Sequence, residues 1–553
     1  MSWTTKSISV STLLAVIFTV ASLNGQSPDF IRTVALSNDV APGSDPVLDF
    51  GEQNIPVIND FGQTAFFTEI DGPAIGGVGG RGEGLFSEAT PTGLSQLFRE
   101  DQVVPGSNGL QTFDGLLNVP LFSNSGQALT SVGGRTGNSI PDRLILRASS
   151  GSNQEVLVDI FGSVSGLSGT NITTPTSQSL RLNDSGEVTF TSDETIFTDT
   201  GGQGFREVIS ASPGQPTILQ ASQTAGISQD ILVTSVNSVA LNDLSQNLFS
   251  ANFNTSFGTS ESGLFIEDVN SGLTLTASTG VDIEPGIELN SISGASFNNQ
   301  GQTVFSAEIG GANVVGAAND SALVGNVGGN LEILVREGDA APGTNSFFSA
   351  FGPFLGSGES LPVLGGGGDT AFVSTITGGG ASPIEALFRI DELGAIDLVA
   401  SEGATVAGLA SGEVIRGFSA PSINANGQVA FQATLTGAGV TFSNDEVIFA
   451  EDINGSLQLI AREGELLNVS DDPNAPDFRL ISGVNFFGGS GNGDGLSSGF
   501  NDLGQVAFRA DLPGFTNTGI FVSDLVVGVP EPNTVLVLLF GASVCLGRRR
   551  RKL

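Results

Sequence analysis

Carboxylates are the side chains with which this chain could do chemistry. The 553 residues include 57 Asp and Glu, 20 Lys and Arg, no His and no Tyr, and the one Cys, Cys545, lies near the C-terminus. This composition excludes His-based general bases, catalytic triads, and thiolate or imidazole metal sites in the body. Two carboxylates about 5–10 Å apart could cleave a glycosidic bond, but no pair stands out. We therefore predict no catalytic residue, with a carboxylate-dependent glycosidase or lyase as the alternative.

Two further patterns carry charged or polar side chains. Arg and Glu recur where predicted strands end, in "RED" at 99–101, "REGD" at 336–339 and "REGE" at 462–465. These could bind sugar hydroxyls, but we favour a local ion pair and turn, which contributes at most about 1 kcal/mol when exposed. The stretch "GGSGNGDGLSSG" at 488–499 could bind a cation through Asp494. Its Gly and Ser content favours a flexible insertion instead.

A turn motif, Asn-x-x-Gly, recurs along the chain about every 63 residues. Asn tolerates the left-handed region and bonds to nearby backbone, and Gly permits positive φ, so the motif predicts a tight structural turn between two strands. Calcium needs more oxygen ligands than this loop supplies. We therefore expect no metal ligand and no cofactor, and keep calcium as the one ion left open. The best copies are Asn59 with Gly62, Asn183 with Gly186, Asn298 with Gly301, Asn424 with Gly427 and Asn501 with Gly504; weaker copies start at Ser123, Asn242 and Gly365.

Each period contains four short runs typical of β-strands. In the seventh, "VIRGFSAPSI" precedes the turn at Asn424, and "QVAFQATL", "EVIFAED" and "LQLIARE" follow it. Alternating apolar residues and tight connections indicate antiparallel strands, and the Phe after each turn is expected to pack between neighbouring sheets. Eight such units predict an all-β fold, a β-propeller of about eight four-stranded blades over residues 29–527. A seven-bladed ring with an insertion, two smaller units and an open solenoid are the alternatives.

The two ends of this domain complement each other. Residues 29–43, "DFIRTVALSNDVAPG", are similar to a fourth strand and its exit loop, such as "LEILVREGDAAPG" at 331–343. The last period stops after "GIFVSDL" at 519–525 and lacks a fourth strand. We therefore predict that the N-terminal strand completes the last blade, which closes the ring and covers an exposed edge.

Both termini carry targeting features. Residues 1–26 contain one Lys, an apolar run and then small residues, and so predict a secretory signal peptide, with a buried helix as the alternative. Residues 529–553 contain Pro530, Glu531 and Pro532, an apolar stretch over 534–547 and a basic cluster over 548–552. A helix of that length spans about 21 Å, against about 30 Å of hydrocarbon, and is a marginal permanent anchor.

The order of these C-terminal features resembles a PEP-CTERM sorting signal, with an ordinary tail anchor as the alternative. The resemblance implies recognition by an exosortase near Pro530, Glu531 and Pro532, transient attachment to the membrane, and a place in a bacterial envelope or exopolysaccharide matrix. The body resembles the family of tandem NxxGxxAF repeats with a choice of anchors. That resemblance implies an envelope or extracellular protein and no established activity.

The charge distribution limits the partners. Six of the 20 basic residues lie in the end segments, so the body carries a net charge of about −43. Nucleic acid and anionic lipid surfaces are therefore poor partners. We expect an exported, non-catalytic binding or scaffold protein that associates with exopolysaccharide. A surface coat protein without a specific ligand is the other alternative to an enzyme.

Overall fold

The described part of the chain is almost entirely β-structure. The computed structural model describes residues 30–524 except 44–47, 73–80, 110, 117–118, 136–141, 151–152, 160–171, 174–179, 199–200, 212–217, 222–230, 256–259, 269–271, 352–361, 379–381, 473, 492 and 515–516. Within these residues the strands form eight sheets of four or five strands and one two-stranded hairpin, and every pairing is antiparallel. The predicted all-β class is confirmed. The signal peptide (1–26) and the sorting segment (529–553) lie outside the described residues.

The sheets are numbered here in chain order. Sheet 1 contains β2 (Asp49–Gln53), β3 (Val57–Ile58), β4 (Thr64–Asp71), β5 (Arg81–Thr90) and β6 (Gly93–Arg99). Sheet 2 contains β7 (Thr112–Leu116), β8 (Leu121–Phe122), β9 (Ala128–Arg135), β10 (Asp142–Ser150) and β11 (Asn153–Asp159). Sheet 3 contains β12 (Ile172–Thr173), β13 (Arg181–Leu182), β14 (Val188–Thr198), β15 (Gly201–Ala211) and β16 (Ile218–Ala221). Sheet 4 contains β17 (Ile231–Leu241), β18 (Asn247–Thr255), β19 (Ser260–Asp268) and β20 (Gly272–Ser278).

The second half repeats this pattern. Sheet 5 contains β21 (Asp282–Glu284), β22 (Ile287–Phe297), β23 (Thr303–Gly310), β24 (Ser321–Gly325) and β25 (Glu332–Arg336). Sheet 6 contains β26 (Phe347–Phe351), β27 (Val363–Leu364), β28 (Thr370–Thr377), β29 (Ile384–Ile390) and β30 (Ile396–Ser401). Sheet 7 contains β31 (Glu413–Phe418), β32 (Ser422–Ile423), β33 (Val429–Gly437), β34 (Glu446–Glu451) and β35 (Leu457–Arg462). The hairpin is β36 (Leu466–Asn468) with β37 (Phe478–Leu480), and sheet 8 contains β38 (Gly483–Asn485), β39 (Val506–Asp511), β40 (Thr518–Ser523) and β1 (Ile31–Leu36).

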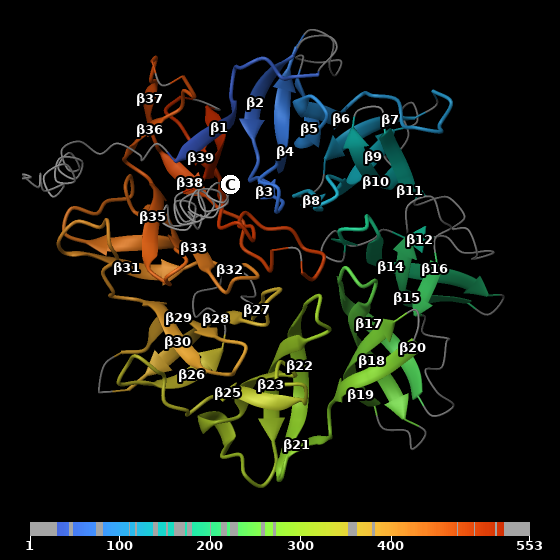
Figure 1. The fold of residues 1–553 in the computed structure, drawn as a ribbon. Helices are drawn as coiled ribbons and strands as arrows, with labels where there is room; N and C mark the ends of the chain where they lie inside the picture. The colour runs from blue at the N-terminus through green and yellow to red at the C-terminus, as the bar shows by residue number, and fades with distance from the viewer. Residues whose placement is uncertain are drawn as a thin grey trace, which may run out of the picture.

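The N-terminal strand belongs to the last sheet, as predicted. β1 pairs antiparallel with β40, with Ile31 opposite Ser523 and Leu36 opposite Gly519. The backbone N–H of Asp524 also donates to the carbonyl of Phe30 at 2.8 Å, so the two ends of the described chain meet. Figure 1 shows the sheets following one another around a common centre, with the first and last lying side by side.

Phenylalanine ladders form the core. A buried Phe follows the turn motif in seven sheets, and in five of them it lies opposite a second buried Phe on the next strand. The buried clusters join residues of adjacent sheets: Phe508 of sheet 8 packs in one cluster with Ile448 and Ile460 of sheet 7. The prediction that this Phe packs between sheets is confirmed. The ring centroids are 5.5 to 6.3 Å apart in the pairs Phe66–Phe86, Phe249–Phe265, Phe372–Phe388, Phe431–Phe449 and Phe508–Phe521.

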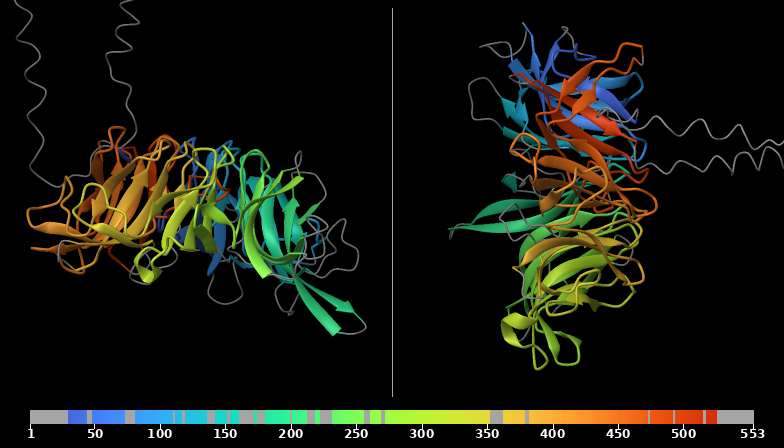
Figure 2. Two further views of the ribbon diagram at one scale, coloured as in Figure 1. Left: turned by 90° about the horizontal axis from the view of Figure 1, so that it is seen from below. Right: turned by 90° about the vertical axis from the view of Figure 1, so that its left-hand side faces the viewer.

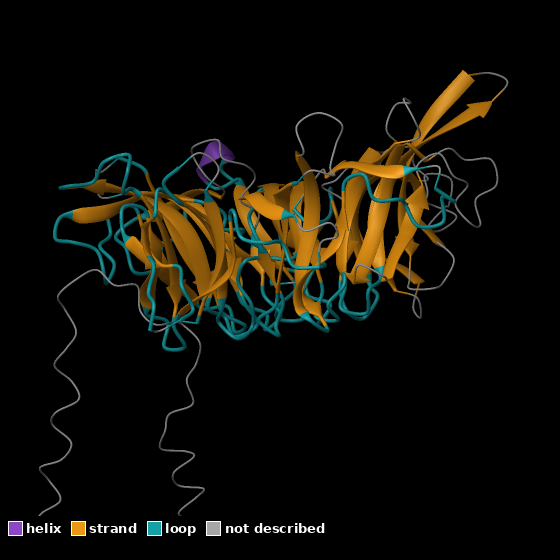
Figure 3. Cartoon of the chain, turned by 90° about the horizontal axis from the view of Figure 1, so that it is seen from above, coloured by secondary structure: helices purple, strands orange, loops and turns teal. Residues whose placement is uncertain are grey.

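The assembly has two faces, seen edge-on in Figure 2. The turn face carries the Asn-x-x-Gly turns and also holds both ends of the described chain, because Gln505, which follows the turn at Asn501, donates to Asp524 at 2.7 Å. The loop face carries the connections from the second to the third strand of each sheet and the exits to the next sheet. The single 3₁₀ turn of the described chain, Gly316–Ala318, lies in such a connection, on the loop face (Figure 3). Among the described residues, no helix has the length and apolar character needed to cross a bilayer.

Candidate functional site

The Asn-x-x-Gly segments form tight turns at the inner edge of the sheets. The side-chain oxygen of Asn59 accepts bonds from the backbone N–H groups of Phe61 and Gln63 at 3.1 and 3.0 Å, and Asn424 does the same with Asn426 and Gln428. The fourth residue of each turn has a φ between 60° and 100°, which glycine adopts without strain. The residues in that conformation are Gly62, Gly126, Gly186, Ser245, Gly301, Gly368, Gly427 and Gly504.

The Asn side chains also connect each sheet to the next. The amide nitrogen donates to the backbone carbonyl at the equivalent position one sheet further on, and the last bond, from Asn501 to Asn59, returns to the first sheet. Among the described turns, this bond to the next sheet is missing only at the two weak copies of the motif in which Ser123 and Gly365 replace Asn. The distances are 3.3 Å from Asn59 to Ser123, 3.1 Å from Asn183 to Asn242, 3.1 Å from Asn242 to Asn298, 3.2 Å from Asn298 to Gly365, 3.1 Å from Asn424 to Asn501 and 2.8 Å from Asn501 to Asn59.

A second set of polar side chains lies one residue further along six of the eight turns, with Gly366 and Ala425 as the exceptions. The backbone N–H of Asp502 donates to the carboxylate of Asp60 at 2.9 Å, and that of Asp60 donates to Asn124 at 2.8 Å. The carboxylate of Asp502 accepts from the N–H of Ala425 at 2.7 Å. Burial raises the pKa of Asp502 to about 6, and the Asp60 carboxylate adds to this shift. The carboxylates of these turns therefore accept bonds from backbone N–H groups and side-chain amides of neighbouring turns.

The stretch 488–499 is not a flexible insertion. It runs through the centre of the assembly, where Figure 1 shows the segment between β38 and β39, and it accepts bonds from the inner strands of distant sheets. The N–H of Leu182 donates to Gly495 at 3.0 Å and the N–H of Ile58 to Ser498 at 3.0 Å. Ser498 is fully buried and Ser497 nearly so. We call residues 486–500 the axial segment.

The axial segment satisfies backbone groups that point toward the centre. In sheets 1, 2, 3, 4 and 7 the residue just before the turn motif donates its N–H to this segment. Buried N–H groups must find partners, and a Gly- and Ser-rich chain can approach them closely because it lacks bulky side chains. A Cβ atom on Gly495 would lie 2.9 Å from the carbonyl oxygen of Leu241. The five donors are Ile58, Phe122, Leu182, Leu241 and Ile423.

Asp494 forms hydrogen bonds within the axial segment. Its carboxylate accepts from the Ser490 hydroxyl at 2.5 Å and from the N–H of Leu496 at 3.0 Å. Burial raises the pKa of Asp494, and the Arg181 guanidinium opposes that rise. No group of three Asp, Glu or Cys side chains in the described part of the chain is arranged to hold a metal ion.

The Arg-Glu segments form exits from one sheet to the next. Asp101, Gly338 and Gly464 take positive φ there, and their N–H groups donate to backbone carbonyls where the following sheet begins, at Phe113, Phe348 and Ile481. Arg462 forms a bidentate pair with Glu413 at 2.7 and 2.9 Å, with side chains only 8% and 6% exposed. Arg336 donates to the backbone carbonyls of Asn319 and Asn313. The predicted turn is present at 462–465, but the predicted local, exposed pair is wrong for Arg462, because its pair is buried and its acid lies 49 residues away.

A polar pocket of about 400 Å³ lies between sheets 6 and 7. β31 supplies Arg416 and Phe418, β29 supplies Glu385, and β33 supplies Gln432 and Thr434. Glu385 lies near the loop-face end of β29, whereas Phe418 ends β31 and pairs with Ala433 in the middle of β33.

Glycine at position 417 keeps this pocket open. The register of β31 against β33 shifts between Ile415 and Gly417, and a Cβ atom on Gly417 would lie 3.6 Å from the Glu385 carboxylate and 3.7 Å from the Thr434 hydroxyl. The Gln432 amide is held in place by Val484 and Phe486 of the neighbouring sheet, at 2.9 and 3.1 Å. The pocket thus gathers a carboxylate, a guanidinium, an amide and a hydroxyl around a small space, which is the chemistry that recognises polar, hydroxyl-rich ligands.

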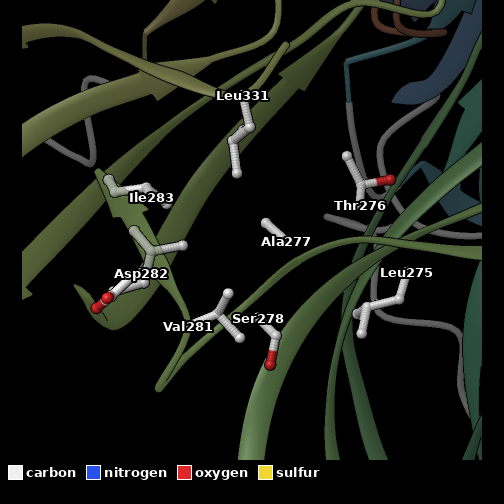
Figure 4. A pocket seen from close by; sticks show the side chains of 9 residues that line it. Leu275, Thr276, Ala277, Ser278, Val281, Asp282, Ile283 and Leu331 are labelled. Atoms are coloured by element: carbon white, nitrogen blue, oxygen red, sulfur yellow. The ribbon is translucent and has the colours of Figure 1, made fainter. Parts of the chain in front are cut away.

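A second pocket, of about 270 Å³, lies between sheets 4 and 5 and is lined mainly by apolar side chains. Figure 4 shows Val281, Ile283 and Leu331 around a common space, with the Asp282 carboxylate directed away from it. It brings few polar groups together, so the pocket between sheets 6 and 7 is the better candidate site.

Sequence reasoning missed the pocket residues. Arg416 and Glu385 belong to different periods, and the packing of sheet 6 against sheet 7 brings them together. Ile415 is equivalent to Phe113, Phe348 and Ile481, because the backbone carbonyl of each accepts a hydrogen bond from the residue at the exit of the preceding sheet. If the periods are aligned on these exit residues, Arg416 is the one basic residue at its position. The equivalent described residues are Gly51, Asp114, Asn290, Ser349 and Ser482.

The repeated antiparallel sheets define an all-β repeat protein with a polar pocket between two repeats. A family model matches residues 58–536, and the chain belongs to this family of unknown function, DUF7453. No curated protein matches the chain.

Solved structures share only a distant likeness. A protein of unknown function from Dyadobacter fermentans is 10% identical, with 76% of this chain and 98% of that chain covered and a TM-score of 0.26. The polysaccharide lyase Uly1 is 8% identical, with 77% and 94% covered and a TM-score of 0.32. A sialidase from Trypanosoma rangeli is 9% identical, with 78% and 58% covered and a TM-score of 0.26. Scores this low assign neither a fold nor an activity to the chain.

Proposed function

We propose that this protein is an exported, eight-bladed β-propeller that binds exopolysaccharide at the envelope or in the extracellular matrix without cleaving it. The single observation that carries the proposal is the polar pocket between sheets 6 and 7, whose lining includes Glu385, Arg416 and Thr434. A binding module needs such a site, and a coat protein without a ligand does not.

The propeller architecture is supported by continuity around the centre. Each of the eight main sheets would be one blade, and the bond from Asn501 to Asn59 joins the last to the first. β1 gives the last blade its fourth strand. An open solenoid would need neither feature.

Export and sorting are supported by the sequence of the termini. The signal peptide over 1–26 and the motif Pro530, Glu531 and Pro532 imply secretion followed by processing by an exosortase-type enzyme. Since Phe30 and Asp524 lie together on the turn face, a membrane helix that follows would hold this face toward the bilayer.

The pocket chemistry favours binding over hydrolysis. Glycoside cleavage by acid and base needs two carboxylates on either side of the scissile bond, and Glu385 is the one carboxylate in the pocket lining. Hydroxyls of a neutral or weakly charged polymer can bond to Glu385, Thr434 and Gln432. No cofactor is required for this role.

The test uses the full-length protein in mild detergent and exopolysaccharide extracted from the producing cells. Retention on the immobilised polysaccharide is measured with calcium and with chelator, while new reducing ends are assayed. We expect saturable retention without cleavage, weakened at least tenfold by Gly417→Leu, which fills the pocket. Gly328→Leu is the control, because its Cβ meets only the flexible end of Glu332. New reducing ends would favour an enzyme, loss of retention in chelator would implicate calcium, and no retention would leave a coat protein.

A further inference from the structure

Arg416 has no partner among the described residues. Each other arginine whose side chain the structure describes has a hydrogen bond or an ion pair. An arginine without an ionic partner is unusual on so acidic a protein, because acidic residues far outnumber basic ones. Arg416 is also exposed and lines the polar pocket. The ion-paired arginines are Arg32 with Glu88, Arg147 with Glu155, Arg389 with Glu451, Arg462 with Glu413, Arg479 with Asp477 and Arg509 with Glu52.

Arg416 also breaks the repeat. The exit bonds fix which residues are equivalent in the first strands of different sheets, and the five equivalents of Arg416 are small, polar or acidic. A side chain that the fold requires would recur at the equivalent position in the other sheets. Arg416 does not recur and has no described partner, which indicates a role other than stabilising the fold.

The pocket lining contains two kinds of recognition group. Glu385 is only 8% exposed and lies near the Thr434 hydroxyl across Gly417, and its carboxylate can accept bonds from ligand hydroxyls. Arg416 lines the same pocket, and its planar guanidinium matches a carboxylate with two parallel bonds. No hydrogen bond or ion pair to another described residue occupies this guanidinium.

From this arrangement we infer that the pocket binds a saccharide that carries one carboxylate, such as a single uronic acid in an otherwise neutral chain. The inference rests on the proposed polysaccharide binding and names its ligand class. Arg416 holds the carboxylate, and Glu385 and Thr434 hold hydroxyls of the same or the next sugar. A polymer with a carboxylate on every sugar is disfavoured, because the body carries a net charge of about −43 and repels polyanions beyond the screening length.

The test compares two ligands that differ only in the charged sugar. A xylo-oligosaccharide bearing one glucuronic acid and the same oligosaccharide without it are titrated into the full-length protein, into Arg416→Gln and into Arg479→Gln. Arg479 is the control, because it is an exposed arginine on β37 paired with Asp477. We expect the wild type and Arg479→Gln to bind the uronate form roughly tenfold to a hundredfold more tightly, as a charge-assisted pair provides. Arg416→Gln should lose this preference and bind the neutral form unchanged.

Two results would overturn the inference. Equal affinity for both oligosaccharides would do so, and so would a preference that survives in Arg416→Gln. Absence of binding to either one also rejects this ligand class. Retention on the extracted exopolysaccharide is measured in parallel and decides separately whether the proposed binding function stands.

Discussion

The side-chain amide of Asn501 donates a 2.8 Å hydrogen bond to the backbone carbonyl of Asn59, across 442 residues of sequence. This bond joins the last turn to the first. The same geometry joins most neighbouring sheets. Asn therefore stabilises the local turns and also links the last sheet to the first.

Asn501→Ala removes this bond and the bonds that Asn501 makes with Gln505 within its own turn. Because buried backbone groups lose their partners, we expect a loss of about 2–3 kcal/mol in the free energy of unfolding. Urea denaturation measures it. Asn474→Ala, on an exposed loop, is the control and should cost less than about 0.5 kcal/mol. Equal effects of the two variants would argue against a stabilising circuit.

Ser497→Ala tests the axial segment. The Ser497 hydroxyl accepts from the N–H of Phe122 at 2.6 Å and donates to its carbonyl at 3.1 Å, in a buried setting. Its removal leaves both groups unsatisfied and should cost about 2 kcal/mol. The exposed Ser443→Ala should change the unfolding midpoint little.

We also expect proteases to spare 488–499 in the native protein; rapid cleavage there would contradict the buried position.

Asp502→Asn tests the carboxylates of the turns. The folded pKa of Asp502, about 6, is above its ordinary value of 3.8, so the folded state binds more protons and stability falls as pH rises between these values. Asn keeps the acceptor for Ala425 and already occupies equivalent positions at Asn124 and Asn299. We expect the variant to be roughly 1–2 kcal/mol more stable at pH 7.5 after solvent screening is allowed for, and less sensitive to pH.

The control for this variant is Asp472→Asn on an exposed loop, which should leave both the stability and its pH dependence unchanged. Stability of Asp502→Asn that falls with pH as steeply as in the wild type would show that Asp502 does not take up a proton on folding.

Arg462→Met tests the buried ion pair. The variant leaves the Glu413 carboxylate buried without its partner, which should cost about 3 kcal/mol. Adding Glu413→Gln should restore part of this loss, because the remaining group is neutral. Arg462 lowers the pKa of Glu413, so the pair's stabilisation is present above the ordinary pKa of Glu and is lost as pH falls through the lowered value. Arg479→Met breaks an exposed pair and should cost under about 1 kcal/mol; a similar cost for both arginines would contradict this account.

The period, the turns and the pairing of the N-terminal strand were predictable from the sequence because they are local or repeated. Asn with Gly at a fixed spacing specifies a turn, and a strand-like segment at one end matches a gap at the other. Even the missing bonds at Ser123 and Gly365 follow from the residue types.

The axial segment and the pocket were not predictable in this way. Gly and Ser over 488–499 are typical of flexible chain, and their burial depends on N–H groups such as those of Ile58 and Leu182 in distant sheets. Arg416 and Glu385 come together only through the packing of sheet 6 against sheet 7. The sequence contains the residues but not the packing that makes them neighbours.

Backbone amide exchange of the full-length protein, with and without saturating exopolysaccharide, tests the central claim most directly. The account predicts slower exchange on binding in peptides that cover 413–419 and 432–434, around the polar pocket. Unchanged exchange there, or protection confined to another surface such as the apolar pocket at 275–289, would contradict it.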